Sequence, residues 1–309
     1  MGLGGTVLLA APTLAESCSN RGGNLDSVVD LSAARRHIPI ECASPYLKSI
    51  GVERLPPLTS PFDPGYDPAT LESHLGQSAH LMASLKISMS CWMIASERAT
   101  RAKIAAARVA GVPAVAGGGP FEIAVAQGAL EPYLDLCAEM GFDRIECASG
   151  FTTMPVPAAR AVRMAHERGL GVQFELGRKH EDAFTREEVE RLVAEGTEWL
   201  EAGAERVVVE ARESAANVGL FASSGELDAG LAERLAGAFG LDRAIFEAPT
   251  KPSQFALLDL LGSRVQLCNV RLEEVLRVEI YRRGLHSDSF LVEKLRPERP
   301  AVDGAPGAA

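Results

Sequence analysis

The fold is indicated most clearly by two consecutive stretches, GFDRIECASG (141–150) and GLGVQFELGRK (169–179). Each begins with a glycine that follows a helical run, continues as a short apolar run that carries a carboxylate, and ends in small or polar residues. Glycine is typical of a helix C-terminus because it adopts the left-handed backbone conformation without strain. Each stretch therefore predicts the end of a helix, a buried strand and a polar loop.

The same unit recurs along the chain at intervals of roughly 20–40 residues, which is typical of a parallel α/β fold. About eight such units predict a TIM (β/α)8 barrel over residues 55–293. The first strand is poor by its pattern because Pro61 interrupts it. An open doubly wound sheet is the alternative, but no GxGxxG motif follows the first strand. Strands are predicted at 58–62, 85–88, 113–116, 144–147, 171–176, 206–210, 244–247 and 265–270, and helices at 68–83, 96–110, 121–140, 157–168, 186–202, 228–239, 252–261 and 272–283.

Two further segments flank the predicted barrel. Residues 1–54 form an N-terminal extension, with short helices predicted at 25–36 and 44–50. It contains the apolar run VLLAAPTLA, but the basic residues that begin a secretory signal are missing, so we interpret its start as a flexible arm. Residues 294–309 are rich in Pro, Gly and Ala and predict a flexible tail. No apolar run approaches the roughly 20 residues that span a bilayer, so no membrane partner is expected.

The composition excludes some classes of function. Among 309 residues, 31 are Lys or Arg and 41 are Asp or Glu, which gives a formal charge of −10. This balance excludes a nucleic-acid partner held by general phosphate attraction, because each neutralised phosphate needs a cation. The six cysteines are scattered without a CxxC pair, which indicates buried free thiols rather than a zinc site. Free thiols favour a reducing, cytoplasmic location.

Charged and polar residues gather where the predicted strands end. Catalytic residues of a TIM barrel lie at these ends, and burying carboxylates is costly unless they are paired or bind metal. Several convergent carboxylates with a few cations indicate Mg²⁺ and a small anionic substrate. The alternative is a ring of ion pairs, with Glu210 against Arg212 and Glu175 against Lys179. The set comprises Asp63, Lys86, Glu146, Glu175, Arg178, Lys179, Glu210, Arg212, Glu213, Glu247 and Asn269.

Two loops offer backbone or side-chain groups to a ligand. Gly117, Gly118 and the glycine after them would let backbone N–H groups approach a ligand closely, although a tight turn explains them equally well. The run EAPTKPSQ (247–254) follows the seventh strand, where barrels often hold phosphate. Lys251 and the N–H groups after it could bind a phosphate, and helix capping by Thr250 is the alternative.

These segments resemble the phosphosulfolactate synthase family, enzymes that add sulfite to phosphoenolpyruvate early in coenzyme M biosynthesis. The resemblance runs from Leu58 to Phe290. It implies a TIM barrel, magnesium dependence and a homo-oligomer. The matching stretches are GGGPFEIAVAQG (117–128), GFDRIECASG (141–150), FELGRK (174–179), EAGAERVVVEARES (201–214), IFEAPTKPSQ (245–254) and EIYRRGLHSDSF (279–290).

The resemblance also implies a reaction and a metal site. A nucleophile would add to the methylene carbon of an enolpyruvyl acceptor, and negative charge would build on the acceptor's carboxylate. Mg²⁺ would stabilise that charge, and its expected ligands are Glu146, Glu175 and Glu247.

The remaining site residues follow from the same reaction. Lys179 is the expected proton donor, because a desolvated lysine can have a pKa near the working pH. Lys86 and Glu210 are the other catalytic candidates. Arginine is expected among the binding residues because its planar fork suits carboxylate or phosphate. The residues expected to bind the anionic substrate are Asp63, Gly117, Gly118, Arg178, Arg212, Lys251, Asn269, Arg282, Arg283 and His286.

The chain departs from the family pattern where that pattern supplies cations. It has Asp-Pro-Gly at 63–65 for Asp-Lys-Gly, Ala-Ala-Asn at 215–217 for Gly-Lys-Gly, and His286 for an arginine. At an effective dielectric near 20, one cation at about 4 Å is worth roughly 4 kcal/mol against a unit charge. We therefore expect a less anionic substrate unless Arg178 or another group compensates. The alternatives are a repurposed bond-forming enzyme of specialised biosynthesis and a non-catalytic barrel protein.

Overall fold

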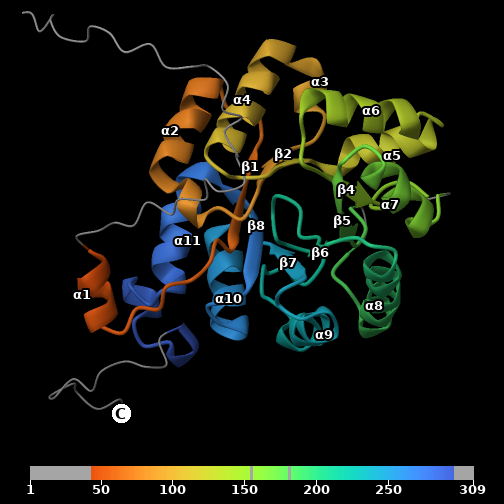
Figure 1. Cartoon of the computed structure of the whole chain (residues 1–309). Helices are drawn as coiled ribbons and strands as arrows, with labels where there is room; N and C mark the ends of the chain where they lie inside the picture. Colours follow the sequence, from red (N-terminus) through yellow and green to blue (C-terminus); the bar gives the residue numbers. More distant parts are fainter. Residues whose placement is uncertain (1–42, 154–155, 180–181, 296–309) are drawn as a thin grey trace, which may run out of the picture. The chain divides into compact units, whose positions relative to one another are not determined.

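Eight parallel strands close into a barrel in the part of the chain that the structure describes (Figure 1). The computed structural model describes residues 43–153, 156–179 and 182–295. Each strand pairs with the next in sequence, and the last pairs with the first, so the TIM-barrel prediction is confirmed and the open sheet is excluded. The strands are β1 (Thr59–Asp63), β2 (Leu85–Ile87), β3 (Ala114–Ala116), β4 (Arg144–Ala148), β5 (Gly171–Leu176), β6 (Arg206–Val209), β7 (Ala244–Glu247) and β8 (Gln266–Arg271).

Strand β1 forms despite its proline. The pairing of β1 with β8 shifts register between Ser60 and Pro61, which marks a bulge. A proline has no N–H to donate to the ladder, and a bulge is one of the few places in a sheet that tolerates this loss. The weak pattern of this segment is therefore a local irregularity in a strand that closes the barrel.

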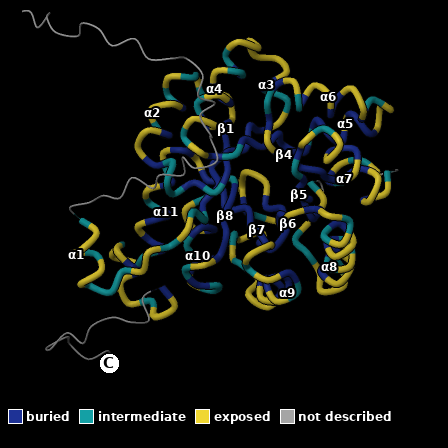
Figure 2. Tube along the Cα trace, viewed as in Figure 1, coloured by how far each residue is buried: buried dark blue, intermediate teal, exposed yellow. Residues whose placement is uncertain are grey.

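Helices cover the outside of the barrel. Figure 2 shows buried strands in the middle and exposed faces on the surrounding helices. The predicted helix at 121–140 is wrong in one respect, since it divides at Gly128, which has a positive φ of 66°. The helices are α1 (Ser44–Ser49), α2 (Pro68–Ser78), α3 (Cys91–Ile94), α4 (Glu97–Val109), α5 (Gly118–Ala126), α6 (Leu130–Met140), α7 (Ala158–His166), α8 (Arg186–Glu201), α9 (Ala229–Phe239), α10 (Lys251–Leu261) and α11 (Val275–Arg282).

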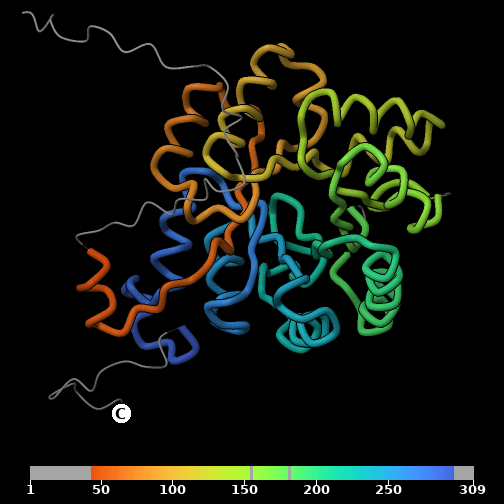
Figure 3. The backbone as a smooth tube through the Cα atoms, viewed as in Figure 1, coloured from red at the N-terminus to blue at the C-terminus, as the bar shows by residue number. Residues whose placement is uncertain are grey.

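The segments that flank the barrel are described in part. Helix α1 confirms the helix predicted at 44–50, and the path of the chain from there to the last short turn, Glu293–Leu295, can be followed in Figure 3. The helix predicted at 25–36 and the tail from residue 296 lie outside the described residues. Within the described ranges, no helix has the length and apolar character that crossing a bilayer requires.

Candidate active site

Four glutamates and two lysines meet at the carboxyl ends of the strands. Glu146, Glu175 and Glu247 lie on β4, β5 and β7, and Glu210 directly follows β6. All four glutamates are at most 2% exposed. Parallel strands present their carboxyl ends at the same mouth of the barrel, so side chains from distant parts of the sequence converge there. We call these glutamates, together with Lys86 and Lys179, the lysine–glutamate cluster.

Lys86, on β2, joins two of the glutamates inside the barrel. Its Nζ lies 3.1 Å from Glu146 Oε1 and 3.2 Å from Glu247 Oε1. Gln173 Nε2 donates to Glu146 at 2.7 Å, and Asn269 Nδ2 donates to Glu247. Burial alone would lower the pKa of Lys86, but the two carboxylates outweigh it and raise that pKa well above its ordinary value. Lys86 is therefore a fixed positive charge in the barrel.

Lys179 joins the other two glutamates and is the more exposed lysine. Its Nζ lies 2.5 Å from Glu175 Oε1 and 2.7 Å from Glu210 Oε2, and its side chain is 25% exposed. Burial opposes the charged form, but Glu175 and Glu210 outweigh it and raise the pKa of Lys179 above its ordinary value. The expectation of a lysine pKa lowered toward the working pH is therefore wrong, because two carboxylates hold the proton on the amine.

The glutamates differ in how firmly they hold a proton. Burial raises the pKa of Glu146 to about 7 against the opposing charge of Lys86. Burial, Glu247 and Glu175 together raise the pKa of Glu210 well above its ordinary value. For Glu175, burial is outweighed by Lys179 and Lys86, which lower its pKa to about 2. Glu210, beside the ammonium group of Lys179, therefore favours its protonated form more than an exposed glutamate does, whereas Glu175 favours its charged form.

Backbone N–H groups after two of the strands, β3 and β6, fix three of the carboxylates. The N–H of Gly118, at the start of α5, donates to Glu146 Oε1 at 3.1 Å. The N–H of Arg212 donates to Glu247 Oε2 at 3.1 Å and to Glu210 Oε1 at 2.6 Å. Arg212 adopts a positive φ of 56°, and Asn269 one of 55°, which costs energy in residues other than glycine. The strain is concentrated at the mouth of the barrel, as is common at functional sites.

The glycines after β3 allow close packing at this mouth of the barrel. A Cβ on Gly118 would lie 3.0 Å from the Cβ of Ala148, and one on Gly117 would lie 3.2 Å from the backbone N of Met89. Both glycines therefore permit close packing, and Gly118 also brings a helix N-terminus against a carboxylate. The tight-turn alternative accounts for both positions in this structure, and their binding of substrate stays a prediction.

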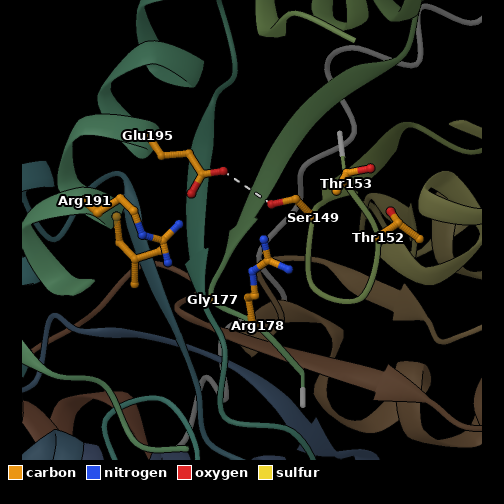
Figure 4. A pocket seen from close by; sticks show the side chains of 8 residues that line it. Ser149, Thr152, Thr153, Gly177, Arg178, Arg191 and Glu195 are labelled. Carbon is orange, nitrogen blue, oxygen red and sulfur yellow. Dashed lines mark hydrogen bonds between the residues drawn. The ribbon is translucent and has the colours of Figure 1, made fainter. Parts of the chain in front are cut away.

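Two of the predicted binding arginines lie at the mouth. Arg212 Nη1 donates to the backbone oxygen of Lys179 at 2.7 Å. Arg178 lines a pocket of about 250 Å³ beside the cluster, together with Arg191 and Glu195 of α8 (Figure 4). Sequence reasoning missed Arg191 and Glu195, because their position on a helix gives no strand-end signal.

Lys251, the first residue of α10, and His286 share two neighbours, Asp288 and Phe255. Lys251 Nζ is 3.7 Å from Asp288 Oδ2 and 5.1 Å from the centre of the Phe255 ring. His286 Nδ1 accepts a hydrogen bond from the backbone N–H of Asp288, and its ring packs against Phe255. Thr250 caps α10, which confirms the capping alternative for this loop. Phosphate binding by Lys251 stays a prediction.

Three predicted binding residues are structural, and their assignment to substrate is wrong. The carboxylate of Asp63 forms a buried ion pair with Lys103 of α4 at 2.5 Å. Arg282 is fully buried and donates to the carbonyl oxygens of Ser263 and Val265 at 2.7 and 2.6 Å, just before β8 begins. Its neighbour Arg283 pairs with Glu279, which Arg282 also contacts. Both arginines thus lie at the amino end of the barrel, opposite the cluster.

The carboxylates are not arranged to hold a metal ion. Over the described ranges, no group of three or more His, Cys, Asp or Glu residues has the arrangement that a metal ion needs. Glu146 and Glu247 are turned toward Lys86, and Glu175 toward Lys179, so the predicted ligands contact ammonium groups. The residues as arranged do not fit Mg²⁺, and we derive no step through a metal.

Gln173 is a member of the site that sequence reasoning missed, although its position carried a signal. It precedes Glu175 by two residues on β5, and residues two apart on a strand share a face. Its Nε2 fixes Glu146, while its Oε1 is buried and makes no hydrogen bond in the structure. A period-two reading of β5 would have placed Gln173 in the barrel interior.

A closed parallel barrel with charged residues at the carboxyl ends of its strands is the arrangement of TIM-barrel enzymes. The chain belongs to the (2R)-phospho-3-sulfolactate synthase (ComA) family, whose model matches residues 53–288. This confirms the family indicated by the sequence motifs, and it makes the chain a member of a family of carbon–sulfur lyases.

Individual relatives agree with the family match. The phosphosulfolactate synthase of Methanocaldococcus jannaschii is 29% identical over 234 residues, which cover 75% of this chain and 93% of that protein. The phosphosulfolactate synthase of Methanothermobacter thermautotrophicus is 28% identical over 234 residues, covering 75% and 91%. The carboxyl transferase domain of Rhizobium etli pyruvate carboxylase aligns with a TM-score of 0.50 at 10% identity, over 75% of this chain and 43% of that chain. That likeness concerns the fold alone.

Proposed function

We propose that the chain adds sulfite, or a related nucleophile, to phosphoenolpyruvate or a related enolpyruvyl acid at the lysine–glutamate cluster. The observation that carries the proposal is the pairing of Lys179, which is partly exposed, with the two buried carboxyl groups of Glu175 and Glu210. The family match over residues 53–288 supports the same chemistry. The small anionic substrate, the homo-oligomer and the cytoplasmic location that the sequence led us to expect belong to the same proposal.

The reaction creates negative charge that the two lysines are placed to stabilise. The lone pair of sulfite forms a carbon–sulfur bond at the methylene carbon, and the electron pair of the double bond moves onto the substrate's carboxylate group. Fixed ammonium groups in a buried site stabilise such a charge without having to reorient. Lys179 is the exposed one of the pair, so we assign it the contact with the substrate, and Lys86 supports the charge from below.

The second carbon must then take a proton, and the cluster can supply one. After the addition, the carbon next to the carboxylate shares the electron pair of the former double bond and is a much stronger base than an amine. Lys179 therefore donates its proton to this carbon even though its own pKa is raised. Glu210 Oε2 lies 2.7 Å from Lys179 Nζ, and burial together with Glu247 and Glu175 raises the pKa of Glu210 well above its ordinary value, which favours a proton on it. Glu210 therefore recharges the amine, and the product leaves with one proton gained and one carbon–sulfur bond formed.

The test is turnover of phosphoenolpyruvate and sulfite, followed by ³¹P NMR with the full chain. We expect a phosphosulfolactate signal from the wild type and a loss of at least about 100-fold in Lys179→Met, since positioned proton donors contribute that much. Circular dichroism must show that the variant is folded. Parallel reactions with Mg²⁺ and with EDTA test the magnesium prediction.

Two results would contradict the proposal. Full activity in a folded Lys179→Met variant would remove Lys179 from the reaction. A wild-type chain that converts phosphoenolpyruvate with neither sulfite nor a panel of other small nucleophiles would overturn the reaction class. Arg186→Gln is the matched control, because Arg186 is an exposed cation at the start of α8, outside the cluster and the pocket.

A further inference from the structure

A polar pocket of about 250 Å³ lies beside the cluster, between the loops that follow β4 and β5 and the middle of α8 (Figure 4). We call it the arginine pocket. Its polar side chains are Ser149, Thr152, Thr153, Arg178, Arg191 and Glu195.

The chemistry of the arginine pocket suits a tetrahedral oxyanion. Figure 4 shows the guanidinium groups of Arg178 and Arg191 turned toward the same space, with the hydroxyl of Ser149 beside it. The Thr152 hydroxyl donates to Glu122 Oε2 at 3.1 Å instead. Guanidinium groups bind phosphate-like oxyanions through paired, charge-assisted hydrogen bonds. Glu195 is the opposing group, and its Oε1 accepts a hydrogen bond from Ser149 Oγ at 3.3 Å.

The arginine pocket and the cluster share a wall. Gly177 lines the pocket, yet a Cβ placed on it would lie 3.2 Å from the Cβ of Glu210. Lys179 follows Arg178 directly, and its backbone N–H donates to the oxygen of Gly150 at 2.8 Å, next to Ser149. The backbone of the proposed proton donor is therefore joined to both loops that line the pocket.

We propose that the arginine pocket binds a tetrahedral oxyanion, the phosphate or sulfo group of a reactant whose reacting carbon meets Lys179. The link to a reactant rests on the proposed function, whereas the binding of an oxyanion does not. The substrate class is thus a small acid that carries a second anionic head group.

Titration calorimetry of the full chain with inorganic phosphate, and separately with methanesulfonate, tests the proposal without any turnover. We expect Arg191→Gln and Arg178→Gln each to weaken binding about tenfold, which is the size of one charge-assisted hydrogen bond. Glu195→Gln should strengthen binding several-fold, because it removes the opposing charge and keeps an acceptor for Ser149. The oxyanion that binds more tightly identifies which head group the pocket takes.

The control variant removes one positive charge outside the arginine pocket. Arg186→Gln removes the same charge from the same helix outside the pocket, so it should leave binding within about twofold of the wild type. Equal losses in Arg186→Gln and Arg191→Gln, no loss in Arg191→Gln, or weaker binding in Glu195→Gln would each overturn the proposal. Oxyanion binding in a chain that shows no turnover would leave the pocket in place and refute only the proposed function. Both pocket arginines are exposed, so their variants should fold, and thermal unfolding checks this.

Discussion

Replacing Lys86 with methionine should destabilise the fold by an amount that grows with pH. Lys86 Nζ lies 3.1 Å from Glu146 and 3.2 Å from Glu247, and all three groups are buried. At an effective dielectric near 20, each contact is worth about 5 kcal/mol of attraction, and burying the charges costs several kcal/mol in return. Removing one partner of a buried pair typically costs about 3–5 kcal/mol, because a charge is left without compensation.

The pH dependence follows from Glu146. Its pKa is about 7 in the folded chain, above the ordinary value of 4.5, so the folded state binds a proton that the unfolded state has released. Folding stability therefore falls as pH rises from 4.5 to about 7 and then levels off. Without Lys86 the pKa of Glu146 rises further, so the variant goes on losing stability above pH 7. Each pH unit is worth at most about 1.4 kcal/mol, so the gap should widen by up to about 2 kcal/mol by pH 8.5.

Urea unfolding of wild type and Lys86→Met at pH 7 and 8.5 measures this gap. Lys251→Met is the control, because Lys251 is half exposed and pairs loosely with Asp288, and its loss should change stability little at either pH. Adding Glu146→Gln to Lys86→Met should recover part of the stability, since a neutral amide needs no cation. A loss below about 1 kcal/mol, or an equal loss at both pH values, would refute the assignment of Lys86 as the buried counter-charge.

Two further predictions concern the residues that the structure removes from the site. Asp63→Asn should lower the free energy of unfolding by about 3–5 kcal/mol in urea, because it breaks the buried pair with Lys103 of α4. Glu53→Gln is the control, since Glu53 pairs with Arg264 at the surface and its loss should have little effect. Equal effects of the two changes would contradict the buried role of Asp63. Arg282→Met should lower the free energy of unfolding by more than about 3 kcal/mol, because Arg282 binds carbonyl oxygens at the amino end of the barrel. The same variant should keep its kcat/KM per folded molecule. A lowered kcat/KM in the folded variant would show that Arg282 belongs to the active site.

The fold was predictable because its signals are local. A glycine that ends a helix and an apolar run after it are visible within ten residues, and each predicted strand, β1 included, agrees with the observed strand to within one residue at each end. Pro61 shows where this reasoning stops. Whether a proline disrupts a strand depends on the register with its partner, and the partner of β1 is β8, at the other end of the chain. No local pattern contains that information.

The contacts of the candidate site are likewise of two kinds, those that the local sequence indicates and those that only the closed barrel brings together. The pair Glu175 and Lys179 has i,i+4 spacing, and the structure confirms this ion pair of the structural alternative. The other pair of that alternative is wrong, since the backbone N–H of Arg212, rather than its guanidinium, meets Glu210. Lys86 contacts glutamates 60 and 161 residues away, so its partners are known only once the barrel is closed.

Motif resemblance did not determine position along the barrel axis. Arg282 and Arg283 belong to a stretch shared with the family, and such a stretch looks like a binding motif. Helix α11 runs from the carboxyl end of β8 back toward the amino ends of the strands, and it carries both arginines away from the mouth. A shared motif therefore indicates a role in the family without saying whether that role is chemical or structural.

The buried contacts at the amino end of the barrel have a consequence for how the protein is made. Thr59 on β1 donates to Glu279 and accepts from Arg282, which follows it by 223 residues. A ribosome delivers β1 long before it delivers α11, so the nascent chain must wait for most of its own synthesis before the barrel can close. Contacts this distant in sequence slow folding and leave strand edges uncovered in the meantime. A chain cut short before β8 would therefore emerge as a sheet with two open edges, suited to aggregation and to chaperone capture.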